Sequence, residues 1–528
     1  MKRNSIILLI ITALALFLRF FRLDQVPPGV NRDEASIGFT AYSLLQTGRD
    51  EYGKFLPISF QSFGDWKLPL YIYITVPFVA TLGMTEVAVR LPSAIAGILT
   101  VLVTFYLVRE LFKSERLALL STFLVAIAPW DLHLSRVESE SNVAVLLTAT
   151  GFFLLFKSFR KQFLVIPAAV LLALTYYTYH GNHISTTLLI VGFVALYWSQ
   201  INKTKFSIMG ALLFIVLVGF ILYHTLLGAD TTKLSGIGLL GDPFVVHERI
   251  ELPRSEHSTP GLLAVVFHNR LFYSIETISD NYIRSFSPQF LFISGGTNGA
   301  HNIPNFGNMY LVEAPFLLIG LFVCLINRKK RPYLFLLWWI AISPIAASIT
   351  KDAPHTNRMF AIFPALPIVV AMGLEILLRR RTVLILIVFL YSINIALYLD
   401  RYYVHFPKTE VAAWGVGYKE LLHYINLPLQ QPKTIIMANP ETSPYIFLAF
   451  YGKENPALFQ KKVERYDPTP DGFCHVRVFG RYQFRQIDWE RDIFYPNALL
   501  VDYPERIPDQ YKSRMLRVAQ FGVIPSYL

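Results

Sequence analysis

The chain has 528 residues, of which 54% are hydrophobic and only 16% are charged. Soluble proteins carry roughly 25% charged residues, so this composition excludes an ordinary soluble protein and indicates an integral membrane protein. In a soluble chain, the net charge of +12 would suggest a nucleic-acid partner. In a membrane protein, the first question is on which side of the membrane the basic residues lie, because their distribution sets the orientation of the chain.

A helix that crosses the membrane needs about 20 mostly apolar residues, and eleven segments are candidates. The first is predicted to be a retained helix, because no small-residue cleavage site follows it. In chain order the candidates are residues 6–21, 91–108, 117–129, 143–156, 163–178, 184–198, 208–227, 310–326, 333–349, 360–378 and 384–399.

A further apolar run, LPLYIYITVPFVATLG at residues 68–83, contains two prolines. If this run does not span and the N-terminus is inside, the inner loops hold seventeen basic and two acidic residues, and the rest of the chain carries −3. This distribution follows the positive-inside rule. The run is therefore predicted to be an interfacial helix within a first outer loop at residues 22–90, and a nucleic-acid partner is not expected.

The same topology predicts a long outer loop at residues 228–309 and an outer C-terminal segment at residues 401–528. That segment contains short strand-like runs, KTIIMA, HVRVFG and NALLVDY, around a helix-like run, PYIFLAFYG. Such a pattern predicts a small α/β domain. We thus expect an all-α polytopic membrane domain at residues 1–400 and an extracytoplasmic α/β domain at residues 401–528.

Ionisable residues gather on the predicted outer face. The first outer loop contains Asp33 and Glu34 directly after the first span, within NRDEASIGFTAYSLLQTG, and Asp33 is predicted to cap a helix that Gly48 ends. Cations at this depth suit a phosphate headgroup. Helix-end arginines such as Arg90 and Arg358 could instead extend along the membrane surface without a ligand.

Six motifs in order resemble the GT-C membrane glycosyltransferases, and more narrowly the bacterial branch related to protein O-mannosyltransferases and aminoarabinose (lipid A) transferases. The motifs are the RDE segment, KLPLYIYITVP, RLPSAIAGILTV, PWDLHLSRVESES, GNMYLVEAPFLLIGL and PHTNRMFAIFPALPIVVAMG. The resemblance covers about residues 6–399. It implies a GT-C fold of about eleven transmembrane helices with a catalytic cavity on the outer face.

The resemblance also implies roles for individual residues. Asp33 corresponds to the base of the acidic pair, with Glu34 beside it and Glu140 or Glu138 as the second acid. The donor-phosphate ligands that it implies are Lys67, Arg90, His355 and Arg358. The chain departs from the family in having KLP where KPP is usual, and in lacking the MIR module of the eukaryotic enzymes.

We therefore expect a glycosyltransferase that moves a hexose or pentose from a polyprenyl-phosphate donor to a protein, lipid or glycan acceptor, with inversion. The expected location is the plasma membrane, with a cytoplasmic N-terminus. No cofactor is certain, and the sequence leaves a divalent metal open. The alternatives are a transporter or flippase, a non-catalytic membrane scaffold and another GT-C enzyme such as an oligosaccharyltransferase, although residues 401–528 contain no WWD-like motif.

Overall fold

The computed structural model describes residues 2–201, 203–227, 239, 243–256, 261–378, 381–427, 432–469, 472–503, 506–512, 518–521 and 524–527. The chain forms two compact units. The first contains Met1–Phe21, Ser93–Ser135 and Ser139–Asp400, and the second contains Arg22–Pro92, Arg136–Glu138 and Arg401–Leu528. The predicted first outer loop thus groups with residues 401–528 in one unit, and the predicted division into a membrane domain and an extracytoplasmic domain stays a prediction.

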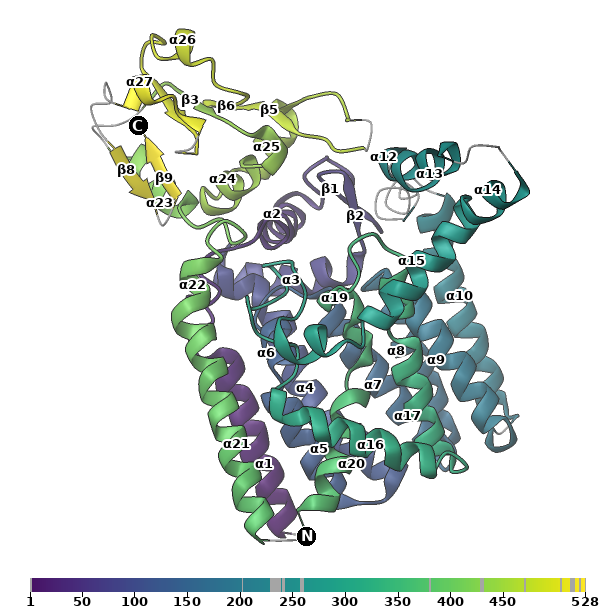
Figure 1. Ribbon diagram of the computed structural model, residues 1–528. Helices are drawn as coiled ribbons and strands as arrows, with labels where there is room; N and C mark the ends of the chain where they lie inside the picture. The colour runs from purple at the N-terminus through teal and green to yellow at the C-terminus, as the bar shows by residue number, and fades with distance from the viewer. Residues whose placement is uncertain are drawn as a thin grey trace. The chain divides into compact units, whose positions relative to one another are not determined.

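The first unit is built of helices that run largely side by side (Figure 1). They are α1 (Lys2–Phe20), α4 (Glu86–Phe112, which begins in the second unit), α5 (Glu115–Ile127), α6 (Pro129–Ser135), α7 (Glu140–Ser158), α8 (Val165–Leu174), α9 (Gly181–Tyr197), α10 (Lys205–Leu227), α12 (Pro243–Val246), α13 (Leu252–Ser255), α14 (Leu262–Phe267), α15 (Arg270–Arg284), α16 (Ala314–Ile326), α17 (Arg331–Ile342), α18 (Ile345–Ser348), α19 (Thr356–Met359), α20 (Ala365–Leu377) and α21 (Arg381–Asp400).

Each of the eleven predicted spans coincides with helix in the structure. By length and composition, five described helices could cross a membrane, or seven if two bent helix pairs each count as one span. A multi-pass membrane protein is thus confirmed, whereas the number of crossings and the orientation of the termini stay predictions. Residues 228–238, 240–242 and 257–260 of the predicted long outer loop, and Arg379 and Arg380 of an inner cluster, lie outside the described residues.

The outer helices expose apolar side chains as a lipid-facing surface requires. On α10, Ile215 and Val216 are more than 60% exposed, and so are Ile385 and Phe389 on α21. In water such faces would be unfavourable, since burying a side chain of this size contributes about 1.5–3 kcal/mol. A surface of this kind indicates contact with hydrocarbon.

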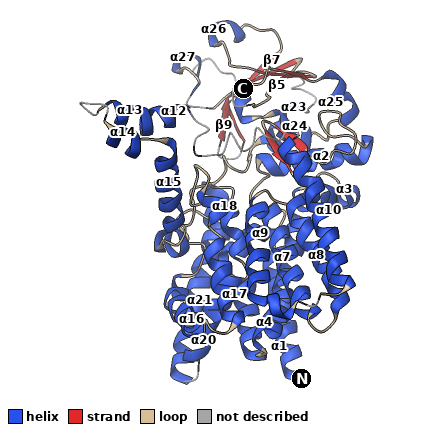
Figure 2. Cartoon of the chain, turned by 90° about the vertical axis from the view of Figure 1, so that its right-hand side faces the viewer, coloured by secondary structure: helices blue, strands red, loops and turns tan. Residues whose placement is uncertain are grey.

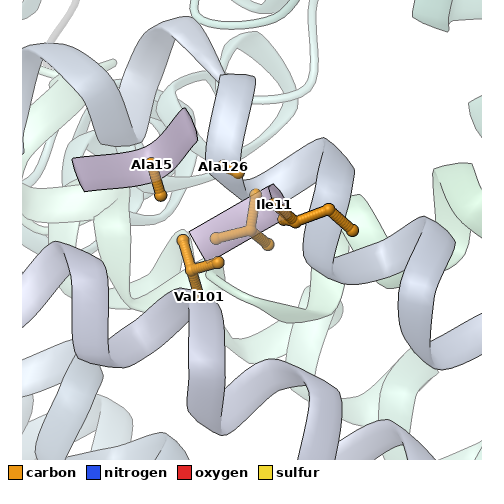
Figure 3. Packing of buried hydrophobic residues seen from close by; sticks show 5 residues of the cluster. Ile11, Ala15, Val101 and Ala126 are labelled. Atoms are coloured by element: carbon orange, nitrogen blue, oxygen red, sulfur yellow. The ribbon is translucent and has the colours of Figure 1, made fainter. Parts of the chain in front are cut away.

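Apolar side chains of α1, α4 and α5 pack together inside the first unit. Ile11 and Ala15 of α1 pack with Val101 of α4 and with Val125 and Ala126 of α5 (Figure 3). One turn farther along α1, the fully buried Arg19 forms an ion pair with Asp131 of α6 and donates hydrogen bonds to the carbonyls of Ala15 and Ala126. A buried charge is tolerated only when it is paired and hydrogen-bonded in this way.

The N-terminal part of the second unit consists of α2 (Arg32–Thr47), a hairpin of β1 (Phe60–Ser62) and β2 (Asp65–Lys67), and α3 (Pro69–Leu82). The predicted helix over residues 68–83 is confirmed as α3, and Gly48 ends α2 in the left-handed region with φ 66°. The prediction that Asp33 caps α2 is wrong. Asn31 is the cap, and it forms a reciprocal capping box with Glu34, because Glu34 is the residue at the third helical position.

The C-terminal part of the second unit is the predicted small α/β domain, and strands of the chain gather there (Figure 2). Its sheet has the order β4-β5-β6-β3-β7, in which β3 pairs in parallel with both β6 and β7. The elements are α22 (Phe406–Thr409), α23 (Tyr418–Ile425), β3 (Thr434–Met437), α24 (Tyr445–Tyr451), α25 (Pro456–Lys462), β4 (Glu464–Arg465), β5 (Val476–Phe479), β6 (Tyr482–Phe484), α26 (Trp489–Asp492), β7 (Ala498–Val501), α27 (Asp509–Lys512), β8 (Val518–Phe521) and β9 (Ile524–Tyr527).

Candidate active site

Asp33 and Lys67 form an ion pair in the second unit. Asp33 lies in the first turn of α2, where a carboxylate is stabilised by the positive end of the helix dipole. The Lys67 ammonium lies 2.9 Å from Asp33 Oδ1, and the Asp33 side chain is 50% exposed whereas that of Lys67 is 7% exposed. The hairpin thus holds a buried cation against a carboxylate that a substrate can still reach.

Glu34 and Arg90 are both fully buried, and they form an ion pair of 3.0 Å. The Arg90 guanidinium also donates to the carbonyls of Leu23, Pro27 and Gly29. Both oxygens of Glu34 accept from Arg90. These contacts favour a structural role for the pair, and the sequence-based roles of both residues stay predictions.

The choice between Glu138 and Glu140 as the second acid stays open. The backbone N–H of Glu138 donates to Glu34 Oε1 at 2.9 Å, which places Glu138 beside the buried pair of the second unit. Glu140 is the first residue of α7 in the first unit, after the cap residue Ser139. The two acids therefore belong to different units.

His355 of the first unit lines a polar pocket together with Asp352, Thr356 and Asn302. Arg358 donates to Thr350 Oγ1 at 2.7 Å and to Asp352 Oδ2 at 3.4 Å. These two hydrogen bonds hold the Arg358 guanidinium in place.

The imidazole of His355 is held in the neutral form. Burial, with the nearby His301 and Arg358, lowers the pKa of His355 well below its usual value. Its Nδ1 accepts the backbone N–H of Arg358 at 3.4 Å, so the proton of the neutral ring is on Nε2. His355 thus offers a neutral hydrogen-bond donor to this pocket, and Arg358 supplies positive charge nearby, beside Asp352.

The structure places further residues around His355 to which the sequence assigns no role. His301 lies with its ring centroid 5.2 Å from that of His355, and Asn298 and Asn302 line the same pocket. A single histidine or asparagine in a glycine-rich loop carries no distinguishing pattern, since these residues are ordinary in turns. Among the described residues, no group of three or more His, Cys, Asp or Glu side chains is placed to hold a metal ion.

The sequence assigns no role to Glu51, another buried acid of the first outer loop. Tyr445 of α24 donates its hydroxyl hydrogen to Glu51 at 3.2 Å. Burial raises the pKa of Glu51 to about 7, against the opposing effect of Arg465 and with a smaller contribution from the charge of Asp50. Glu51 thus connects the loop to the C-terminal α/β domain inside the second unit.

Glu51→Gln is expected to remove a pH dependence of stability. Between pH 4.5 and 7 the unfolded carboxyl ionises while the folded one keeps its proton, so wild-type stability falls as the pH rises through this window. A pKa difference of this size corresponds to about 3 kcal/mol. Thermal unfolding of both proteins at pH 4.5, 6 and 8 would show a smaller fall in the variant; parallel curves would contradict the assignment.

Comparison with known proteins tests the expected resemblance to the GT-C membrane glycosyltransferases. Residues 9–224 match the model of the dolichyl-phosphate-mannose-protein mannosyltransferase family. A search of curated protein sequences found no match. The fold is similar to that of ArnT from Cupriavidus metallidurans bound to undecaprenyl phosphate, with a TM-score of 0.54, 13% identity and coverage of 98% of this chain and 97% of that one.

The archaeal oligosaccharyltransferase AglB from Archaeoglobus fulgidus, in complex with an inhibitory peptide and a dolichol-phosphate, also aligns, with a TM-score of 0.49 and 14% identity. The alignment covers 85% of this chain but 63% of AglB, so the chain spans less than two thirds of that protein. The expected resemblance is confirmed: the chain has the fold of the GT-C membrane glycosyltransferases, and its residues 9–224 match their protein mannosyltransferase family.

Proposed function

We propose that the protein is an integral membrane glycosyltransferase that moves a sugar from a polyprenyl-phosphate donor to an acceptor hydroxyl on the outer face of the plasma membrane. The observation that carries the proposal is the ion pair of Asp33 and Lys67, an accessible carboxylate beside a nearly buried ammonium. The undecaprenyl phosphate bound to ArnT supports a donor of this class, because the two chains align over almost their whole length.

In the proposed reaction, Asp33 takes the proton of the acceptor hydroxyl as that oxygen attacks the anomeric carbon. The bond between this carbon and the phosphate oxygen breaks, and the polyprenyl phosphate leaves with the electron pair. A single displacement of this kind inverts the anomeric centre. The donor sugar is a hexose or a pentose, and the acceptor is a protein, lipid or glycan.

The leaving phosphate needs fixed positive charge in the transition state. Lys67 has three N–H donors, so it can bind Asp33 and a phosphate oxygen together. We assign Arg358 as a further cation for the phosphate and His355 as a neutral donor to it through Nε2. Glu34 and Arg90 are assigned as positioning residues, because their ion pair fixes the start of the helix that carries Asp33.

The proposal is tested by incubating membranes that contain the full-length protein with radiolabelled polyprenyl-phosphate hexoses and pentoses. Transfer of label to an envelope protein, lipid or glycan, with release of polyprenyl phosphate, is the expected result. Movement of the lipid across the bilayer without a transfer product would instead show a flippase. Absence of both would contradict the proposal.

Lys67→Met is expected to raise the KM for the donor by about 10- to 100-fold, since a hydrogen bond to a charged group contributes roughly 1.5–3 kcal/mol. Because Lys67 would also stabilise the charge that develops on the leaving phosphate, kcat should fall as well. Lys54→Met is a matched control, because the Lys54 ammonium lies over the Trp66 ring in the same loop and has no role in the proposed site. An unchanged donor KM in the Lys67 variant would remove Lys67 from the donor site.

A further inference from the structure

A small, open crevice lies in the C-terminal α/β domain, away from every residue assigned above. It lies where the parallel strands β3 and β7 end, and α23 forms another of its sides. The lining residues are Val416, Gly417, Tyr418, Leu421, Met437, Ala438, Asn439, Thr442, Val501, Asp502 and Tyr503.

The topology of the sheet favours a binding site at this position. After β3 the chain reaches β6 on one side of it, and it then crosses to β7 on the other side. The segments that follow β3 and β7 therefore leave the same edge of the sheet next to each other. In open α/β sheets, ligands bind in the crevice outside the carboxyl ends of parallel strands, at the point where the chain reverses direction across the sheet.

Two buried polar side chains line the crevice at this edge. Asn439 follows β3 and is 2% exposed, and Asp502 follows β7 and is 8% exposed. Asn439 donates its amide hydrogen to Asp502 Oδ1 at 3.3 Å, and the backbone N–H of Tyr503 donates to the same oxygen at 2.7 Å. Asn439 Oδ1 is buried and meets no hydrogen-bond donor among the described residues.

An acceptor left without a donor in the protein costs free energy, because burial removes the water that would otherwise donate to it. Burial also raises the pKa of Asp502. The backbone around Asn439 is itself strained, since Asn439 and Ser443 both adopt left-handed conformations, with φ 58° and 57°. Strain and unsatisfied acceptors that coincide in a crevice are characteristic of binding sites.

The lining sets the chemistry of the ligand. Among the described residues that line the crevice there is no Lys, Arg or His. Arg506 lies near enough for its charge to act on Asp502, but no cation lies in the described wall itself to bind a phosphate or carboxylate. Asn439 Oδ1 and the Asp502 carboxylate accept hydrogen bonds, so the ligand must supply donors. Apart from Thr442, the other lining residues are apolar or aromatic, and Tyr418 is fixed by stacking on Phe447 with centroids 4.4 Å apart.

We propose that this crevice binds a neutral sugar unit, whose hydroxyl groups donate to Asn439 Oδ1 and to Asp502 and whose apolar C–H face packs against Tyr418 and the neighbouring apolar side chains. Binding here requires no donor lipid and no step of the proposed transfer reaction. The proposed sugar site can therefore be tested independently of the proposed function.

The test measures binding of neutral methyl glycosides to the purified full-length protein by saturation-transfer NMR and titration, in a detergent without a sugar headgroup. The variants are Asp502→Asn, which removes the charge, and Asn439→Gly, which removes the amide but keeps the left-handed backbone accessible. Each is expected to weaken binding about tenfold or more. Asp509→Asn, an exposed carboxylate on α27 of the same domain, is the matched control and should bind as the wild type does.

Three results would overturn the proposal. The first is no saturable binding of any neutral glycoside up to about 10 mM, a concentration that detects even millimolar ligands. The second is wild-type affinity in both crevice variants. The third is a preference for a sugar phosphate or an amino sugar over the neutral glycoside. Melting temperatures of all variants, measured in the same buffer, distinguish a lost contact from a lost fold.

Discussion

Asp33→Asn is expected to lower the rate of sugar transfer by about 10²- to 10⁴-fold, the range that general-base catalysis contributes. The substitution keeps the size and shape of the side chain, and its oxygen can still accept from Lys67, which lies 2.9 Å from the carboxylate. It removes the group that would take the proton from the acceptor hydroxyl. The rate is measured with saturating donor and acceptor in membranes, so that the change is one of kcat.

Asp24→Asn is the matched control for this experiment. Asp24 is an exposed carboxylate in the segment that follows α1, in the same unit as Asp33. Its replacement should leave transfer unchanged. Wild-type transfer by the Asp33 variant would show that another group acts as base, while an equal loss in both variants would indicate a general effect of charge near the loop.

Arg90→Met is expected to destabilise the second unit by about 3–5 kcal/mol, because it leaves the buried Glu34 carboxylate without its partner. The loss would also leave the carbonyls of Leu23, Pro27 and Gly29 without the donors that the guanidinium provides. Little folded protein should remain at 37 °C. Thermal unfolding in detergent and the monodisperse fraction in size-exclusion chromatography measure the effect.

Two further variants separate the explanations of this result. Combining Arg90→Met with Glu34→Met removes both charges, and it should recover much of the stability, since an apolar pair can replace a buried ion pair at little cost. Arg116→Met removes an arginine whose side chain is 55% exposed, and it should be neutral. If Arg90→Met kept the wild-type melting temperature but lost donor binding, Arg90 would be a phosphate ligand and not a positioning residue.

Local patterns in the sequence were sufficient to predict most elements. Apolar runs of the right length marked all eleven helical segments of the membrane part, and short β-branched runs marked β3, β5 and β7. These features depend on neighbouring residues only. The cap of α2 was mistaken by two positions, because Asn31 and Asp33 are both good cap residues and only the backbone geometry distinguishes them.

The sequence by itself determined that this is a membrane protein and which of its segments are helices, and it predicts that an acidic pair, a lysine and a late His-Arg segment carry its chemistry. Only the tertiary structure decided which of these charged side chains pair with one another. It paired Glu34 with Arg90 in the interior and Asp33 with Lys67 near the surface. It also brought His301 to His355 and Asn439 to Asp502. Each of these contacts joins residues 34 to 63 positions apart, and burial rather than residue type sets their energies, so no local pattern contains them.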